Sequence, residues 1–246
     1  MVDIIIPVYD NPSYLDRALK SIQDTCSIDK ITIYIVNDCS PYDSQQYESV
    51  IKKFSDLDIV YTISPENQGP GAARNIGIKM GHNPYICFLD MDDIYIDDVV
   101  KYCDENYDMF ITNIGKNEVM DYAHTSVIGP IHGLGVKRSI IETYNLYFSN
   151  WRYGGEDTIF RLLCLACSEN CKYYNETYYF YKIRYDSNFT HRARPVKFRP
   201  IDKYEEDTRG RQNWFGHCLK EIENLTNLDV LMQTSHWNDI MLEGFC

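Results

Sequence analysis

Carboxylate side chains follow two of the strands that the sequence predicts, at the points where those strands end. Asp90-Met91-Asp92-Asp93 comes directly after the apolar run 85–89, and Asp38 follows the run 31–36. The carboxyl ends of parallel strands meet at one edge of an open sheet, so these acids are expected to lie together. Carboxylates gathered in this way need a cation, and Mg²⁺ or Mn²⁺ suits such ligands and would also bind a diphosphate. Capping of the following helices is the alternative role for these aspartates.

Two glycine-bearing segments begin predicted helices. In the segment 67–75, which reads Asn-Gln-Gly-Pro-Gly-Ala-Ala-Arg-Asn, glycines such as Gly71 let the backbone approach a ligand. Arg74 lies in the first helical turn, where it could reach a phosphate or a base. Gly154-Gly155-Glu156-Asp157 places two carboxylates at a helix N-terminus, whose dipole stabilises their charged form. One of them could therefore act as a base, although dipole complementation alone would also explain both.

Short apolar runs alternate with helical patterns in the first half of the chain. Strands are expected over 3–8, 31–36, 58–63 and 85–89, and helices from Pro12 with Asn11 as the cap, around 47–54 and over 72–80. This alternation predicts βαβ units and an α/β fold, with a Rossmann-like, mostly parallel sheet flanked by helices. Beyond about residue 110 the alternation loosens, and we expect a helix over 156–166, a strand over 171–183 and helices near 214–224 and 229–242.

Composition narrows the class of protein. The chain has 246 residues and a net charge of −12, which argues against a general binder of nucleic acid or of anionic membranes. Nine cysteines follow no disulfide framework, and no apolar run reaches the length of a membrane span. With no leader-like N-terminus, a cytoplasmic protein is expected. The segment 182–220 is the exception in charge, with ten Lys and Arg against five Asp and Glu.

Five motifs of the chain resemble those of the family 2 inverting glycosyltransferases, which use nucleotide-sugars and have the GT-A fold. They occur in the family's order and spacing over roughly residues 2–190, and they are the segments 4–11, 35–40, 67–75, 88–93 and 155–157. The resemblance implies a GT-A domain over 1–185, with a nucleotide-sugar-binding part (1–110) and an acceptor and catalytic-base part (111–185). Residues 186–246 would form a basic segment and a small helical C-terminal extension.

The resemblance also implies which residues bind the donor. The backbone at the end of the first strand and the side chain of Asp38 would hold the nucleotide base, usually uracil, with Arg74 beside the nucleotide. The residues implied to bind the nucleotide-sugar are Pro7, Val8, Tyr9, Asp38, Gly71, Arg74, Asp90, Met91 and Asp93. Asn37 stands where the family usually has an acid, and Cys39 where it usually has glycine, which makes the choice of base less secure.

Metal and catalytic roles follow from the same motifs. Asp92 would be the principal ligand of Mn²⁺ or Mg²⁺, with Asp90 beside it. The family often adds a late histidine, for which His191 is a candidate and His132 a second, although a surface histidine without a metal role is the simpler interpretation of either. Asp157 would be the general base that removes the acceptor's proton, supported by Glu156.

The predicted function is therefore metal-dependent transfer of a sugar, with inversion, from a UDP-sugar to an acceptor hydroxyl, by default on a saccharide. A nucleic acid or modified base is the alternative acceptor, because the basic segment also carries aromatic residues. A non-catalytic nucleotide-sugar-binding module is an alternative from another class. Phosphoryl transfer by a haloacid-dehalogenase-like fold is a further one, but there the Asp-x-Asp motif ends the first strand.

Overall fold

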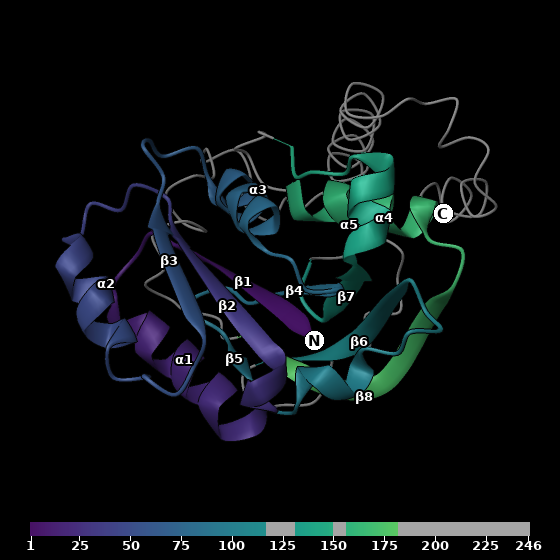
Figure 1. Ribbon diagram of the computed structural model, residues 1–246, viewed down its shortest axis with the longest axis horizontal. Coiled ribbons are helices and arrows are strands. Elements are labelled where there is room, and N and C mark those ends of the chain that lie inside the picture. The colour runs from purple at the N-terminus through teal and green to yellow at the C-terminus, as the bar shows by residue number, and fades with distance from the viewer. Residues whose placement is uncertain (117–130, 150–155, 182–246) are drawn as a thin grey trace, which may run out of the picture.

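A computed structural model describes residues 1–116, 131–149 and 156–181, and these residues contain one eight-stranded sheet (Figure 1). The strands, in chain order, are β1 (Val2–Val8), β2 (Ile31–Asn37), β3 (Ile59–Ile63), β4 (Tyr85–Phe88), β5 (Ile94–Tyr95), β6 (Met109–Lys116), β7 (Leu134–Lys137) and β8 (Cys171–Tyr181). Their order in the sheet is β3-β2-β1-β4-β7-β6-β8-β5. The helices are α1 (Ser13–Thr25), α2 (Ser44–Ile51), α3 (Pro70–Met80), α4 (Arg138–Tyr144) and α5 (Glu156–Cys167), with 3₁₀ turns at Ile28–Lys30 and Val99–Tyr102.

The first four strands form a parallel half-sheet. β1 pairs with β2 on one side and β4 on the other, and β2 pairs with β3, all in parallel. Every residue of β1 and β2 is buried, as expected of strands covered by helices on both faces. In the register, Val8 lies opposite Asn37 and Ile5 opposite Phe88, so the carboxyl ends of β1, β2 and β4 open onto one edge.

The second half of the sheet reverses direction. β7 runs antiparallel to β4 and to β6, and β8 runs parallel to β6. Cys87 lies opposite Gly135, so the beginning of β7 stands beside the end of β4. A Cβ atom on Gly135 would collide with the ring of Phe110, so a glycine is needed for these strands to pack this closely.

The short strand β5 links the turn after β4, in the middle of the sheet order, to β8 near its end. It begins one residue after the acidic turn that follows β4, yet it pairs with β8, with Tyr95 opposite Tyr179. The turn 90–93 therefore connects strands that are four places apart in the sheet order. This connection places β8 beside the carboxyl end of β4.

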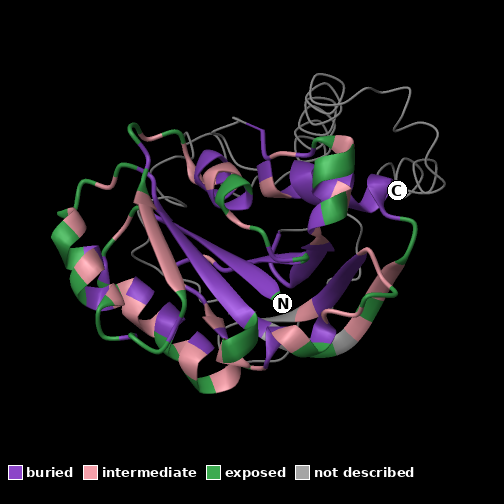
Figure 2. Ribbon diagram, in the orientation of Figure 1, coloured by how far each residue is buried: buried purple, intermediate pink, exposed green. Residues whose placement is uncertain are grey.

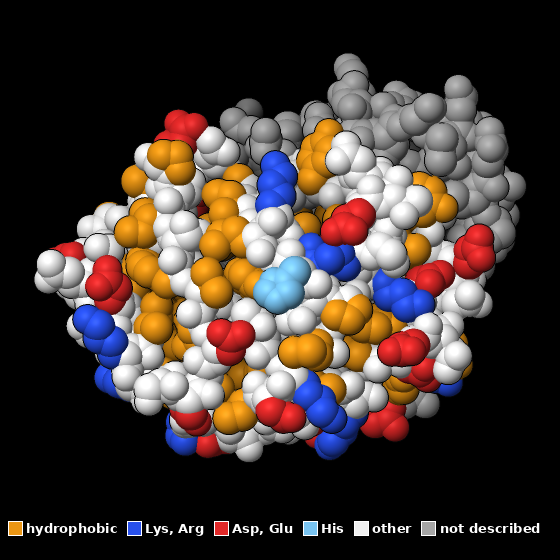
Figure 3. Space-filling model, in the orientation of Figure 1, with side chains coloured by type: hydrophobic (Ala, Val, Ile, Leu, Met, Phe, Trp, Pro, Cys, Tyr) orange, Lys and Arg blue, Asp and Glu red, His pale blue; other side chains and the backbone are white. Residues whose placement is uncertain are grey.

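Helices cover both faces of the sheet (Figures 1 and 2). One buried cluster joins α1 and α2 to residues such as Ile4 and Ile6, and a second joins α3, α4 and α5 to residues such as Ile5 and Phe88. Alternate residues of β1 thus enter opposite layers, which is the period of a strand. At one end of the sheet order, β3 is only half-buried, and hydrophobic side chains gather over it in Figure 3. Ile63, the last residue of β3, is 50% exposed.

The fold confirms the predicted α/β architecture and the order of its elements up to residue 89. The first helix begins at Ser13, one residue later than predicted, because Pro12 precedes the helix while the Asn11 side chain accepts a hydrogen bond from the Ser13 amide. The helix 156–166 and the strand beginning at 171 are also confirmed. The predicted segment 186–246, with its helices, lies outside the described residues. Within the described part of the chain, no helix is both long enough and apolar enough to cross a membrane.

Candidate active site at the carboxyl edge of the sheet

The carboxyl ends of β1 and β2 are joined by Asp38. Its amide donates to the carbonyl of Val8 (2.9 Å), and its carboxylate accepts hydrogen bonds from the amides of Gln68 (2.9 Å) and Gly69 (2.7 Å). Gly69 has a φ of 94°, a conformation that glycine adopts readily and that turns its amide towards this carboxylate. Asp38 therefore fixes the loop that begins α3.

The side chain of Asn37 makes structural hydrogen bonds at the same edge of the sheet. Its side-chain amide donates to the Tyr61 hydroxyl (2.9 Å), and its side-chain oxygen accepts from the Ser40 amide (2.8 Å). Both groups of Asn37 are thus used, one as a donor and one as an acceptor, whereas a carboxylate here could only accept and would need Tyr61 to donate its own hydrogen. The substitution noted in the sequence has a structural role here.

Tyr9, in the first motif, is exposed to solvent. Pro7 and Val8 are buried within β1, whereas Tyr9 is 45% exposed and its carbonyl accepts a hydrogen bond from the Ser40 hydroxyl. Of the three predicted donor-binding residues, Tyr9 alone offers an exposed aromatic ring at this edge. Aromatic rings of this kind stack on nucleotide bases.

The four side chains of the acidic turn after β4 differ in how far they are buried. Met91 is buried in the core, so its side chain is not available to a donor. Asp92 is half-buried, and its carbonyl accepts a hydrogen bond from Arg17 (3.0 Å). Asp93 is fully buried, whereas the Asp90 side chain is 27% exposed. The turn thus holds three carboxylates in different environments.

Arg74 joins this turn to the start of α5. Its guanidinium lies 2.7 Å from an Asp90 oxygen and 3.3 Å from a Glu156 oxygen, and it sits over the ring of Phe148. Arg74 is 3% exposed. The structure therefore pairs Arg74 with two carboxylates, and its contact with a nucleotide remains a prediction.

His132 is buried, which corrects the expectation of a surface histidine. Its Nε2 lies 3.1 Å from one oxygen of Asp90 and 3.9 Å from one of Asp93, and its ring packs against Tyr179 at 4.8 Å between centroids. It reaches the turn because it lies two residues before β7, which begins beside the end of β4. His191, the other candidate, lies outside the described residues.

Charge interactions at this cluster shift several pKa values. Burial by itself raises the pKa of Asp90, but the charge of Arg74 and the hydrogen bond with His132 outweigh it and hold that pKa below its usual range. Burial raises the pKa of Asp93 to about 8, and the charges of Asp92 and Asp90 add to the rise. Burial lowers the pKa of His132, but its hydrogen bond to Asp90 outweighs burial and raises the pKa above the usual value. A second negative charge beside Asp90 is therefore unfavourable in this place with little water, unless a cation offsets it.

A divalent cation fits the donors of this cluster. Among the described residues, Asp90, Asp93 and His132 each offer one ligand atom, and these atoms lie within 4.8 Å of one another. Two carboxylate oxygens and an imidazole nitrogen suit Mn²⁺, and carboxylates also suit Mg²⁺. Asp92, the ligand predicted from the resemblance, is not a member of this group of three.

The start of α5 brings two further carboxylates to the same region. Glu156 is 8% exposed, and burial together with the charge of Asp157 raises its pKa. Asp157 is half-buried and accepts a hydrogen bond from the Thr158 amide (2.8 Å). A Cβ atom on Gly71 would approach Glu156 Cγ to 3.0 Å, so this glycine lets α3 and α5 pack closely. Any contact of Gly71 with the donor remains a prediction.

Comparison with known proteins identifies the family of the chain. The model of the family described as "Glycosyl transferase family 2" matches residues 3–163, which is more than half of the chain. The chain belongs to glycosyl transferase family 2. The family 2 match includes Asp90, Asp93 and His132 and ends before Tyr179.

One curated relative and two solved structures are similar to this chain. GgaB of Bacillus subtilis, named as a minor teichoic acid biosynthesis protein, is 27% identical over 247 residues, covering 88% of this chain and 25% of GgaB. The crystal structure of Staphylococcus aureus TarS 1-349 in complex with UDP-GlcNAc has a TM-score of 0.67 at 17% identity, covering 77% of this chain and 60% of that one. The mannosyltransferase PcManGT from Pyrobaculum calidifontis, in complex with GDP-Man and Mn²⁺, has a TM-score of 0.61 at 14% identity, covering 76% and 58%.

These structural similarities confirm the GT-A fold. The chain spans less than half the length of curated relatives that share 35% identity with it, 18% of one and 40% of another. The sequence similarity to these relatives therefore covers only part of each of them.

Proposed function

We propose that the chain is a metal-dependent, inverting glycosyltransferase that moves a sugar from a UDP-sugar to a hydroxyl group of a saccharide. The observation that carries this proposal is the meeting of Asp90, Asp93 and His132 at the carboxyl edge of a family 2 domain. In open α/β sheets, ligands bind at this edge. A cluster of acids there suits the metal-bound diphosphate of a nucleotide-sugar.

The nucleoside would lie at the ends of β1 and β2. Tyr9 offers an exposed ring, and Asp38 holds the loop 68–69 against this edge. The related fold of TarS binds UDP-GlcNAc, which supports a uridine donor. We therefore place the uracil near Tyr9 and Asp38, with the diphosphate directed towards the turn 90–93.

Mn²⁺ or Mg²⁺ would be held by Asp90, Asp93 and His132, and the resemblance adds Asp92 from the same turn. A cation at this place supplies positive charge that stabilises the leaving nucleoside diphosphate. PcManGT, whose fold is similar, was crystallised with GDP-Man and Mn²⁺, which supports a divalent metal. Separate Asp92→Asn and Asp93→Asn substitutions, compared by Mn²⁺ affinity, identify which aspartate is the stronger ligand.

The side chains at the start of α5 would perform the proton transfer. Asp157 accepts the proton of the acceptor hydroxyl, whose oxygen forms a bond to the anomeric carbon as the bond from that carbon to the diphosphate oxygen breaks. Attack from the face opposite the leaving group inverts the anomeric centre. Arg74 holds Glu156, next to Asp157, against Asp90 and so fixes the base relative to the donor.

A saccharide acceptor is supported by GgaB, whose name places it in teichoic acid biosynthesis. The net charge of −12 argues against the alternative of a nucleic acid acceptor. A non-catalytic binding module would need no base, so the second alternative is tested through Asp157.

Release of UDP from a panel of UDP-sugars, measured with Mn²⁺ and saccharide acceptors, tests the proposal. We expect Asp157→Asn to bind UDP with an affinity close to that of the wild type but to lower turnover by roughly 10²–10⁴-fold, the usual contribution of a general base. Asp43→Asn, at the cap of α2, is the matched control and should retain full turnover. Equal turnover of Asp157→Asn and the wild type would exclude Asp157 as the base.

A further inference from the structure

Tyr179 of β8 contacts all three members of the metal-binding cluster. Its hydroxyl donates a hydrogen bond to Asp93 Oδ2 (2.6 Å) and accepts one from the Asp90 amide (3.2 Å). Its ring packs against the ring of His132, with 4.8 Å between centroids and 31° between planes. One side chain thus touches two carboxylate residues of the turn and the imidazole.

The position of Tyr179 is fixed by its own surroundings. The residue is fully buried, lies opposite Tyr95 in the pairing of β5 with β8, and packs edge-on against the Tyr95 ring at 5.8 Å. The strand β5 follows the acidic turn directly, so this pairing carries Tyr179 to the turn. A buried ring held on two sides can orient its neighbours.

A metal site needs more than ligands of the right type. Carboxylate and imidazole groups bind a cation well when neighbouring groups keep their ligand atoms pointing towards it. Loss of such neighbouring groups typically weakens metal binding. The Tyr179 hydroxyl fixes one oxygen of Asp93, and its ring fixes the plane of His132.

We propose that Tyr179 is a positioning residue that orients Asp93 and His132 and thereby sets the affinity of the site for a divalent cation. This inference rests on the metal site of the proposed function. Tyr179 touches the ligands and does not itself bind the cation or the donor. Its removal should therefore weaken metal binding without abolishing the cluster.

Mn²⁺ binding to the full chain, measured by electron paramagnetic resonance without any donor, tests this role. Tyr179→Phe keeps the ring and removes the hydroxyl, and we expect its Kd for Mn²⁺ to rise roughly tenfold to hundredfold. Tyr102→Phe is the matched control, because the Tyr102 hydroxyl also donates to a carboxylate (Asp97, 3.0 Å) and the residue is also buried. Its Kd should equal that of the wild type.

The outcomes separate this inference from the proposed function. A wild-type chain that binds no Mn²⁺ contradicts the metal site itself and, with it, the role of Tyr179. A wild type that binds Mn²⁺ while folded Tyr179→Phe binds it equally well overturns the inference alone. Thermal unfolding in EDTA shows whether the variant is folded.

A second measurement keeps the test open if Tyr179→Phe does not fold. 3-Fluorotyrosine at position 179 retains the hydroxyl, and its fluorine resonance reports on the surroundings of the ring. We expect saturating Mg²⁺ to shift this resonance and to leave that of 3-fluorotyrosine at position 102 unchanged. A resonance at position 179 that does not move when Mg²⁺ binds would overturn the inference.

Discussion

Arg74 shows at the scale of single residues how the site is held together. Its positive charge lies between Asp90 and Glu156, all three with little access to water. Burial lowers the pKa of Arg74, but the charges of Asp90 and Glu156 outweigh burial and raise it. The guanidinium therefore stays charged and stabilises two carboxylates that would otherwise repel each other and the nearby Asp93.

Arg74→Met retains the bulk of the side chain and removes its charge. We expect the free energy of unfolding to fall by about 3–5 kcal/mol, because two largely buried carboxylates lose their partner. Urea denaturation measures this loss. Lys53→Met is the control, since the exposed Lys53–Asp16 pair should contribute less than about 1 kcal/mol. Similar losses in the two variants would contradict the assigned role of Arg74.

The thiol of Cys39 can report on the proposed position of the uracil ring. Its exposed thiol follows Asp38 at the end of β2, whereas burial raises the pKa of the thiols of Cys164, Cys167 and Cys171 and slows their reaction. We expect UDP at ten times its Kd to slow alkylation of Cys39 by roughly tenfold if the two are mutually exclusive. Mass spectrometry of the labelled peptides measures this rate, with Cys103 as the internal control. An unchanged rate of Cys39 alkylation in saturating UDP would show that the uracil binds elsewhere.

Prediction from the sequence placed at this edge the residues whose location follows from their position in the chain. Asp38 and Asp90 could be found because each follows a buried apolar run, and the ends of parallel strands meet. His132 and Tyr179 have no such local signal. His132 is a single histidine between Ile131 and Gly133, and Tyr179 is one of 21 tyrosines in the chain. Their placement beside the acidic turn arises from pairings between distant strands, which a local pattern does not specify.

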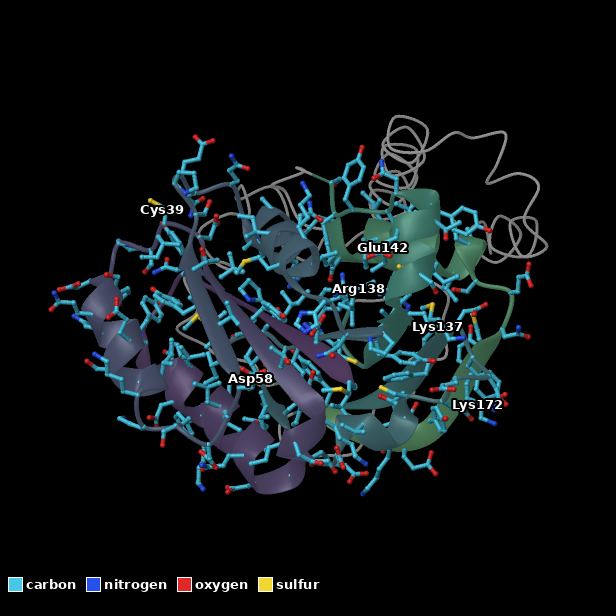
Figure 4. All side chains as sticks on the ribbon, viewed as in Figure 1. Cys39, Asp58, Lys137, Arg138, Glu142 and Lys172 are labelled. Carbon is cyan, nitrogen blue, oxygen red and sulfur yellow. The ribbon has the colours of Figure 1, made fainter. Side chains whose placement is uncertain are left out.

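At the scale of elements, a second buried charge network ties the helices to the opposite edge of the sheet. Asp3 of β1 pairs with Arg138 at the start of α4 (2.6 Å) and accepts two hydrogen bonds from Asn83. Arg138 also donates to the carbonyl of Ile78 near the end of α3. Figure 4 shows Arg138 between α4 and the sheet. One guanidinium therefore joins β1, α3 and α4.

Asp3→Ala tests the strength of this connection. The change leaves Arg138 without its partner in a largely buried place, so we expect a loss of about 3–5 kcal/mol in the free energy of unfolding. Asp58→Ala is the control, since the Asp58 carboxylate accepts from Thr32 at an exposed position and its loss should cost less than about 1 kcal/mol. Guanidinium denaturation of both variants provides the comparison. A loss for Asp3→Ala no larger than that for Asp58→Ala would contradict the role of the pair.

Element prediction was more complete in the parallel half than in the antiparallel half. The runs 3–8 and 31–36 are continuously apolar because β1 and β2 are buried on both faces, and helical periodicity separates them. By contrast, β7 has only four residues, Leu134–Lys137, and β5 only two, Ile94–Tyr95. Strands this short carry no readable period. Their place in the sheet depends on packing, as the close approach of Gly135 to Phe110 illustrates.

At the scale of the whole molecule, the two halves of the sheet supply different parts of one site. The parallel half provides Asp38, Arg74 and Asp90, whereas β7 and β8 of the other half bring His132 and Tyr179. α5 adds Glu156 and Asp157 from the layer above. The proposed metal site therefore exists only when both halves are folded together. Donor and metal are expected to stabilise the fold as a unit, because they bind the native state and not the unfolded one.

The central claim is a uridine nucleotide bound through a divalent metal at the carboxyl edge of the sheet. Calorimetric titration of UDP into the wild-type chain, once with Mn²⁺ and once with EDTA, tests it without knowledge of the acceptor. The account predicts that UDP binds with Mn²⁺ at least about tenfold more tightly than with EDTA, a difference of roughly 1.4 kcal/mol. Equal affinity in the two titrations, or no binding of UDP in either, would contradict it.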